Sequence, residues 1–196
     1  MEDYKIKYLK MLSELDVDTG LVEWLENNGF FISPATSKFH HSYQGGLCQH
    51  SVEVAENSIK LKNSLLPPES ISDSSLIKLG LLHDISKSSC FELTSVNKKI
   101  YSPDGNKFDD LGNFYWESQL GYKYKDDIVL PGNYGFSSYM IAKPFISFTD
   151  DEIIALSNYQ YILNPNDSVN SLRLMGTNKL MTLLAMSDIS SSYLTI

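Results

Sequence analysis

The stretch that decides how the fold is interpreted is Leu81-Leu82-His83-Asp84-Ile85-Ser86-Lys87. An apolar run that begins at Leu76-Ile77 leads into it, and a His-Asp pair stands at its centre. Adjacent side chains on a helix point about 100° apart, so this pair cannot surround an ion by itself. It can supply one imidazole nitrogen and one carboxylate oxygen, provided that other segments of the chain close the site.

The length and composition of the chain indicate one domain over residues 1–196, in which residues 1–35 form N-terminal helices. A chain of this size buries roughly 70% of its unfolded surface and needs no disulfides. Its two cysteines, Cys48 and Cys90, form no framework and suit a reducing cytosol. The first ten residues lack the apolar core of a signal peptide, and no stretch is long enough to span a membrane. We therefore expect a cytoplasmic protein without a membrane partner, in a bacterial cell or a phage-infected host. The composition does not indicate an oligomeric state.

The net charge of −8 restricts the class of partner. Proteins that grip duplex nucleic acid usually offer a basic face to the phosphates. This chain has 16 basic residues against 24 acidic ones and no basic run, so binding to long duplex nucleic acid is disfavoured. A small anionic substrate remains compatible with this charge, because a bound cation reverses the local field.

Apolar periodicity predicts a mainly α-helical fold. Leu47, Val54 and Leu61 recur at seven-residue spacing, and His50 lies on the same inward stripe. A lone histidine on an apolar face is more often a hydrogen-bonded core residue than a metal ligand. The expected helices cover residues 3–15, 20–28, 47–63, about 73–84, 136–142, a segment capped by Thr149, and about 178–193.

Two carboxylates occupy positions where a buried leucine would be expected. Ile77 and Leu81 place the next inward helical position at about Asp84, and Asp188 follows Leu184 by four residues. A buried carboxylate needs a partner or a metal. These positions therefore point toward a polar site inside the helical core.

Residues 91–130 have a different residue pattern, in which aromatic and β-branched residues alternate with polar ones. The turn signal Ser102-Pro103-Asp104-Gly105-Asn106 lies between two such runs. We predict an inserted β-hairpin with a third short strand at residues 121–125. The alternative, a long mobile loop, is disfavoured by the aromatic content. Residues 164–170 are predicted to form a polar loop.

Together, the inward polar positions offer two imidazoles and two carboxylates on three predicted helices. This mixture suits a divalent cation such as Mn, Fe, Co, Ni or Zn more than calcium. The candidate metal ligands are His50, His83, Asp84 and Asp188.

In order and in helical placement, these residues resemble the H…HD…D pattern of the HD-domain phosphohydrolase superfamily. The segment from His40-His41 through Gly45-Gly46-Leu47 to His50-Ser51 is similar to the approach to the first ligand in bacterial and phage members. The stretch 81–87 resembles their L-L-H-D-I-x-K signature, and Leu184-Ala185-Met186-Ser187-Asp188 is similar to their last segment, where Ala-Asp is more usual. The resemblance covers roughly residues 36–194. It implies an HD-domain helical bundle with an inserted β-hairpin, and His50, His83, Asp84 and Asp188 as the metal ligands.

The chain departs from this pattern at two places. Many relatives carry two further histidines that help to bind a second metal. Here Tyr134 stands at the first place, within Asn133-Tyr134-Gly135-Phe136-Ser137-Ser138, and Tyr159 stands at the second. A phenol ionises only at about pH 10, so it is a poor substitute for a neutral imidazole. The resemblance then favours one divalent metal ion, which would be Mn, Fe, Co, Ni, Zn or Mg.

The resulting functional hypothesis is hydrolysis of a phosphoester or anhydride in a nucleotide or short oligonucleotide. Asp84 would act at the metal, and Lys87 would hold a phosphate oxygen, although it could equally be a solvated helix end. His41 would contact the substrate or donate a proton to the leaving group, whereas His40 is expected to be exposed. Tyr134 and Tyr159 would bind substrate, or else act as packing residues.

Two alternatives remain open at this point. One is an exonuclease-like activity on a single-stranded 3′ end, which some similar proteins have. The other is a catalytically inactive module that keeps the fold and binds a nucleotide or a protein. The retention of two buried carboxylates argues against the inactive module.

Overall fold

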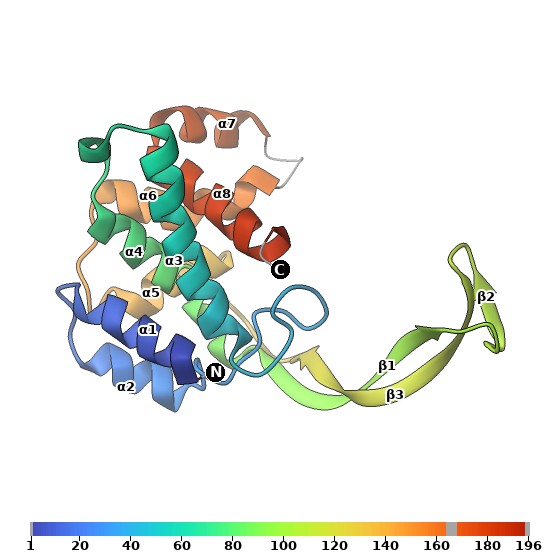
Figure 1. Cartoon of the computed structure of the whole chain (residues 1–196). Helices are drawn as coiled ribbons and strands as arrows, with labels where there is room; N and C mark the ends of the chain where they lie inside the picture. The colour runs from blue at the N-terminus through green and yellow to red at the C-terminus, as the bar shows by residue number, and fades with distance from the viewer. Residues whose placement is uncertain (1, 164–167, 195–196) are drawn as a thin grey trace.

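The structure is a computed structural model that describes residues 2–163 and 168–194. It is mainly helical with a small antiparallel sheet, as predicted, and Figure 1 shows a helical body from which a long β-ribbon stands off. The helices are α1 (Glu2–Ser13), α2 (Gly20–Asn27), α3 (Gly46–Leu65), α4 (Asp73–Leu82), α5 (Tyr134–Ala142), α6 (Asp150–Asn158), α7 (Ser168–Thr177) and α8 (Lys179–Tyr193), with short 3-10 helices η1 (Pro68–Ser70), η2 (Ile85–Ser89) and η3 (Tyr159–Leu163). The strands are β1 (Phe91–Tyr101), β2 (Lys107–Asp109) and β3 (Gly112–Tyr124).

Helix α3 lies at the centre of the helical body (Figure 1) and contributes to two hydrophobic clusters. Leu47 and Val52 pack into a cluster with α1, α2 and α4, whereas Val54 packs into a cluster with α4, α6 and α8. His50 lies between these positions and is completely buried. Burial of leucine-rich faces on both sides supplies the main driving force for this packing.

The helix boundaries follow local sequence signals. Thr149 and Glu152 form a reciprocal capping box at the start of α6, as the sequence predicts. Gly29 ends α2 with a φ of 73°, a left-handed conformation that glycine adopts without a steric penalty.

The central His-Asp stretch does not continue the helix that precedes it. Helix α4 ends at Leu82, His83 is its C-cap, and Asp84 has a φ of −123° before η2 begins. Asp84 is nevertheless only 1% exposed. Its inward position was expected from helical periodicity, but the turn between α4 and η2 is what directs it into the core.

The insertion forms an antiparallel ribbon in which β1 pairs with β3 from Phe91↔Tyr124 to Tyr101↔Phe114. The predicted third strand at residues 121–125 is wrong, because 121–124 complete β3. The third strand is instead β2, which pairs with the start of β3. The predicted turn does follow β1, and a second reversal at Gly112 (φ 121°) brings β2 against β3.

The predicted polar loop at 164–170 also needs correction. Residues 168–170 belong to α7, and residues 164–167 lie outside the described part of the chain. Among the described residues, no helix combines the length and the apolar composition that crossing a membrane requires.

Candidate metal centre

The four side chains predicted as metal ligands come together between three segments. His50 projects from the first half of α3, His83 and Asp84 lie at the end of α4, and Asp188 lies on α8. His50 and His83 are fully buried and Asp84 is 1% exposed, whereas the side chain of Asp188 is 20% exposed. The site is therefore buried at His50, His83 and Asp84 and reaches solvent at Asp188.

Ligand atoms of His50, His83 and Asp188 lie at separations that suit a common cation. His50 Nε2 is 3.2 Å from His83 Nε2 and 3.1 Å from Asp188 Oδ1, and Asp84 Oδ2 is 3.4 Å from His83 Nε2. Asp84 Oδ2 is 3.9 Å from His50 Nε2, the widest of these separations. Two atoms bound about 2.1 Å from one metal lie roughly 3.0 Å apart at an octahedral angle and roughly 3.4 Å apart at a tetrahedral one. His50, His83 and Asp188 thus form a group whose ligand atoms all lie within 4.8 Å of one another and could hold one divalent cation, whereas Asp84 lies outside this group.

The hydrogen bonds of both imidazoles determine which nitrogen faces this centre. His83 Nδ1 donates to the carbonyl oxygen of Gly80 at 2.8 Å. His50 Nδ1 lies 3.0 Å from Ser191 Oγ, whose own hydroxyl donates to Glu53 Oε2 at 2.9 Å. The serine oxygen therefore accepts from His50. In both rings the Nδ1 proton points away, so an Nε2 lone pair faces the centre.

Asp84 is held by two further side chains. Lys87 Nζ donates to Asp84 Oδ2 at 2.6 Å, and the Tyr159 hydroxyl donates to Asp84 Oδ1 at 3.0 Å. The Lys87 side chain is only 13% exposed, and its ammonium lies 4.8 Å from the ring centre of Tyr134. Lys87 is therefore not a solvated helix end. Tyr159 is buried and its hydroxyl is committed to Asp84, whereas Tyr134 is half-buried.

His40 and His41 lie beside the centre, on the loop before α3. Their ring centres are 5.1 Å and 5.4 Å from that of His50. His40 was expected to be exposed, but it is half-buried, and burial lowers its pKa to about 4. The Nδ1 atoms of both rings are buried and have no hydrogen-bond partner among the described residues.

Glu53 is a member of the site that the sequence analysis missed. It is 6% exposed on α3, one helical turn after His50, and its Oε2 accepts from Ser191 and lies 3.0 Å from His41 Nε2. Gln49 donates to its other oxygen at 2.8 Å. A carboxylate three residues after a candidate ligand was a usable signal, since such residues share a helix face. Ser191, at the same spacing after Asp188, offered no comparable signal.

Electrostatics favour ionised carboxylates at this centre. Burial alone would raise the pKa of Asp84, but Lys87, His83 and His50 hold it well below its usual value. Burial also opposes ionisation of Asp188, yet His50 lowers its pKa. The pKa of His50 is lowered, chiefly by burial, whereas the carboxylates outweigh burial and raise the pKa of His83. A proton and a cation therefore compete for the His83 imidazole.

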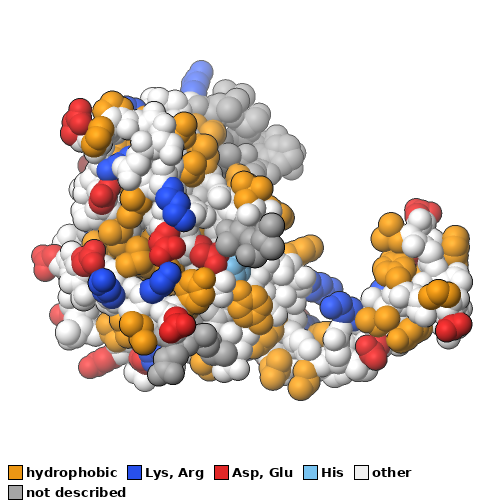
Figure 2. Space-filling model, in the orientation of Figure 1, with side chains coloured by type: hydrophobic (Ala, Val, Ile, Leu, Met, Phe, Trp, Pro, Cys, Tyr) orange, Lys and Arg blue, Asp and Glu red, His pale blue; other side chains and the backbone are white. Residues whose placement is uncertain are grey.

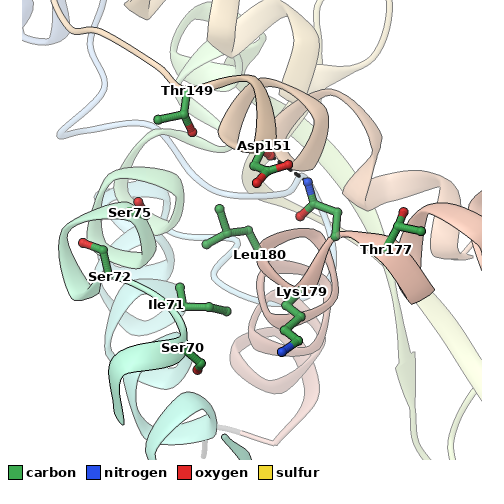
Figure 3. Close-up of a pocket in the computed structure, with 10 residues that line it drawn as sticks. Ser70, Ile71, Ser72, Ser75, Thr149, Asp151, Thr177, Lys179 and Leu180 are labelled. Carbon is green, nitrogen blue, oxygen red and sulfur yellow. Dashed lines mark hydrogen bonds between the residues drawn. The ribbon is translucent and has the colours of Figure 1, made fainter. Parts of the chain in front are cut away.

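A separate hollow lies at the opposite ends of α4 and α8, where the N-termini of α4, α6 and α8 meet (Figure 3). It contains no histidine, and two of its three helix ends, those of α6 and α8, are already capped by side chains, whereas Ser72 makes no side-chain cap at α4. Asn178 accepts from the backbone N–H of Met181, and Thr149 accepts from that of Glu152. Because it holds no histidine and the caps of α6 and α8 use N–H groups that an anion would need, the hollow is not the candidate metal centre.

No family model, curated protein or solved structure matches this chain.

Proposed function

We propose that this protein is a metal-dependent phosphohydrolase of the HD-superfamily type, which acts on a phosphoester or anhydride of a nucleotide or short oligonucleotide through one divalent cation. The observation that carries the proposal is the convergence of His50 Nε2, His83 Nε2 and Asp188 Oδ1 while both Nδ1 protons are directed away. Facing lone pairs repel one another unless a cation or a proton lies between them. The H…HD…D order of the motifs supports the same proposal.

The donor set fits a borderline transition metal. Imidazole nitrogens and carboxylate oxygens suit Mn, Fe, Co, Ni or Zn, and His50, His83, Asp84 and Asp188 would hold the ion. A cation bound there lowers the pKa of a bound water and offsets charge on the phosphoryl group. The remaining chemistry belongs to the side chains around it.

Lys87 and Tyr134 would bind the substrate at the edge of the centre. The Lys87 ammonium is a point charge that can exchange its contact with Asp84 for a phosphate oxygen. It also lies over the Tyr134 ring, 4.8 Å from the ring centre. We assign Tyr159 to orienting Asp84, because its hydroxyl is already donated to that carboxylate. Tyr159 would thus act through Asp84 and not by contact with substrate.

His41 would supply a proton to the leaving oxygen. Its Nε2 is bound to Glu53, which fixes the orientation of the ring, and its Nδ1 has no partner among the described residues. Transfer of a proton from this nitrogen would neutralise the alkoxide or phosphate that departs. The acidic surface of the chain favours a small substrate that the centre itself attracts.

Metal content and activity test this proposal together. Protein purified without chelator should hold about one equivalent of metal. Asp188→Asn should lower the metal content and abolish hydrolysis, whereas Asp104→Asn, at the exposed turn of the ribbon, should change neither. The screen should include deoxynucleotides, ribonucleotides, cyclic dinucleotides and short single strands with free 3′ ends. A wild-type protein that contains no metal, and gains none from Mn²⁺, contradicts the proposal.

A specific contact favours a second candidate, a catalytically inactive nucleotide-binding module. Lys87 lies 2.6 Å from Asp84 Oδ2, the oxygen that also faces the histidines, so the lysine already neutralises this carboxylate without a metal. In that case calorimetry would detect nucleotide binding in chelator-treated protein, and no product would form with any metal.

A further inference from the structure

The β-ribbon has one apolar face and one polar face. In an antiparallel pair, partners in register project to the same side. One face thus carries Phe91 with Tyr124, Leu93 with Tyr122, Ser95 with Leu120, Asn97 with Ser118, Lys99 with Trp116 and Tyr101 with Phe114. The other carries Glu92 with Lys123, Thr94 with Gly121, Val96 with Gln119, Lys98 with Glu117 and Ile100 with Tyr115. The first set, called the aromatic face below, is the side of a sheet that normally packs on a core.

The aromatic face is uncovered along most of its length. Leu93 is 60% exposed, Leu120 77% and Trp116 48%. Figure 2 shows hydrophobic side chains gathered on the part of the ribbon farthest from the body. A two-stranded ribbon is only marginally stable in water unless its apolar face is packed. The structure thus leaves a face that requires a partner.

The pattern on this face is complementary to itself. This face carries two apolar clusters, one near the body (Phe91, Leu93, Leu120, Tyr122 and Tyr124) and one near the tip (Tyr101, Phe114 and Trp116). Between them lies a short polar segment, called the waist below, where Ser95 and Ser118 are hydrogen-bonded at 2.6 Å. A two-fold axis through the waist would place each copy's tip cluster on the other's body-side cluster. The serines would then face one another, where they can exchange hydrogen bonds.

Charge distinguishes a second copy from other occupants. Residues 91–124 carry four lysines and five carboxylates, so they lack the basic excess that a phosphate backbone or an anionic lipid surface attracts. On the aromatic face, Lys99 is already paired with Asp109 at 2.6 Å. Most of the chain's negative charge lies in the helical body, so two ribbons can approach one another with less repulsion than two bodies.

We propose that the aromatic face is a homodimer interface, in which two ribbons pack face to face about a two-fold axis near Ser118. The face is eleven residues long, or about 36 Å at roughly 3.3 Å per residue, and two strands wide. This places the contact at the small end of specific interfaces, so the dimer dissociates on dilution. The interface is independent of the proposed metal chemistry.

Sedimentation velocity across a range of protein concentrations tests the proposal. The full-length wild type is expected to change from monomer to dimer as concentration rises. Leu120→Asp should weaken dimerisation roughly tenfold or more, because it places a carboxylate within the apolar contact. Gln119→Asp, one residue away on the polar face, should leave dimerisation unchanged, and circular dichroism should show the same helical content in all three proteins.

Crosslinking gives a second readout. Cys48 and Cys90 are buried, so a short bifunctional maleimide should join two copies of Ser118→Cys but not two copies of Gln119→Cys. A protein that stays monomeric at every concentration overturns the proposal, as does a dimer that Leu120→Asp leaves intact. Binding of monomeric protein through this face to anionic vesicles or to a single-stranded oligonucleotide would assign the face to a different occupant and also overturn it.

Discussion

At the scale of single residues, Glu53 connects the imidazoles of His50 and His41, for which different roles are proposed. Its Oε2 accepts a hydrogen bond from the Ser191 hydroxyl, whose oxygen in turn accepts the Nδ1 proton of His50. The same Oε2 lies 3.0 Å from His41 Nε2. One buried carboxylate can therefore set the tautomer of a candidate metal ligand and the orientation of a candidate proton donor. Hydrogen bonds of this kind raise the basicity of the ligand and hold it in place.

We predict that Glu53→Gln weakens metal binding by about 10- to 100-fold, the typical effect of removing such an orienting partner. The amide can offer its N–H₂ group to Ser191 and so disturb the orientation that His50 requires. Isothermal titration calorimetry with Mn²⁺ or Co²⁺ measures the change. Glu56→Gln, on the same helix but partly exposed, is the matched control. Equal affinity in the two variants would show that Glu53 has no part in positioning the ligand.

Glu53 also predicts a pH dependence of stability. Burial opposes its ionisation, but hydrogen bonds from His41, Gln49 and Ser191 outweigh burial and lower its pKa in the folded state. A lowered folded-state pKa adds stability above the unfolded-state pKa, and this stability is lost as the pH falls through the folded-state pKa. The free energy of unfolding of wild type should exceed that of Glu53→Gln by roughly 1–3 kcal/mol at neutral pH. Denaturant titrations should show this difference shrinking below about pH 4.5; a constant difference would refute the assignment.

At the scale of elements, the contact between α3 and α4 holds His50 and His83 at the right separation. Gly80 lies against Ala55, where a Cβ on Gly80 would be 2.5 Å from the Ala55 Cα. The carbonyl of the same glycine accepts the Nδ1 proton of His83. The close approach of the two helices and the tautomer of His83 thus depend on one position.

Gly80→Ala is expected to destabilise the protein by roughly 1–3 kcal/mol, because the added methyl group meets backbone and forces the helices apart. It should also weaken metal binding, since α3 carries His50 and the end of α4 carries His83, two of the proposed ligands. Gly176→Ala in α7 is the control: nothing lies within 4 Å of its Cβ position, so the thermal midpoint should stay the same or rise slightly. Equal thermal midpoints for the two variants would show that the contact between α3 and α4 at Gly80 can accommodate a methyl group.

At the scale of the whole molecule, the ribbon lies outside the apolar packing of the helical body. Neither hydrophobic cluster of the body contains a residue from 91–124. The ribbon therefore adds little to the packing that holds the candidate metal centre, although β1 begins directly after η2.

Replacing residues 95–120 with an Asn-Gly turn between Thr94 and Gly121, which are register partners, should leave the body folded. Metal affinity should change less than about threefold, within the usual scatter for distant sites. Dimerisation should be lost. Calorimetry and sedimentation of the same sample measure both properties. A shortened protein that loses its helical circular dichroism would show that the ribbon is part of the folding unit.

Much of this architecture could be predicted from local patterns. The cap at Thr149 and the turn at 102–106 depend on neighbouring residues alone, as does the inward position of His50. The third strand could not be located in this way, because the 107–109 segment is short and pairs only after a second reversal at Gly112. Residues 168–170 likewise look polar and loop-like, yet they start a helix.

The sequence alone determined the types and order of the candidate ligands and the helices that bear His50 and Asp188, since apolar periodicity and capping act over a few residues. Only the tertiary structure decided which imidazole nitrogens face the centre, that Lys87 and Tyr159 hold Asp84, and that Glu53 joins Ser191 to His41. His50 and Ser191 are 141 residues apart, and their hydrogen bond exists only when α3 packs against α8. Periodicity indicates which side chains point inward, but the atoms that meet there depend on how the helices pack.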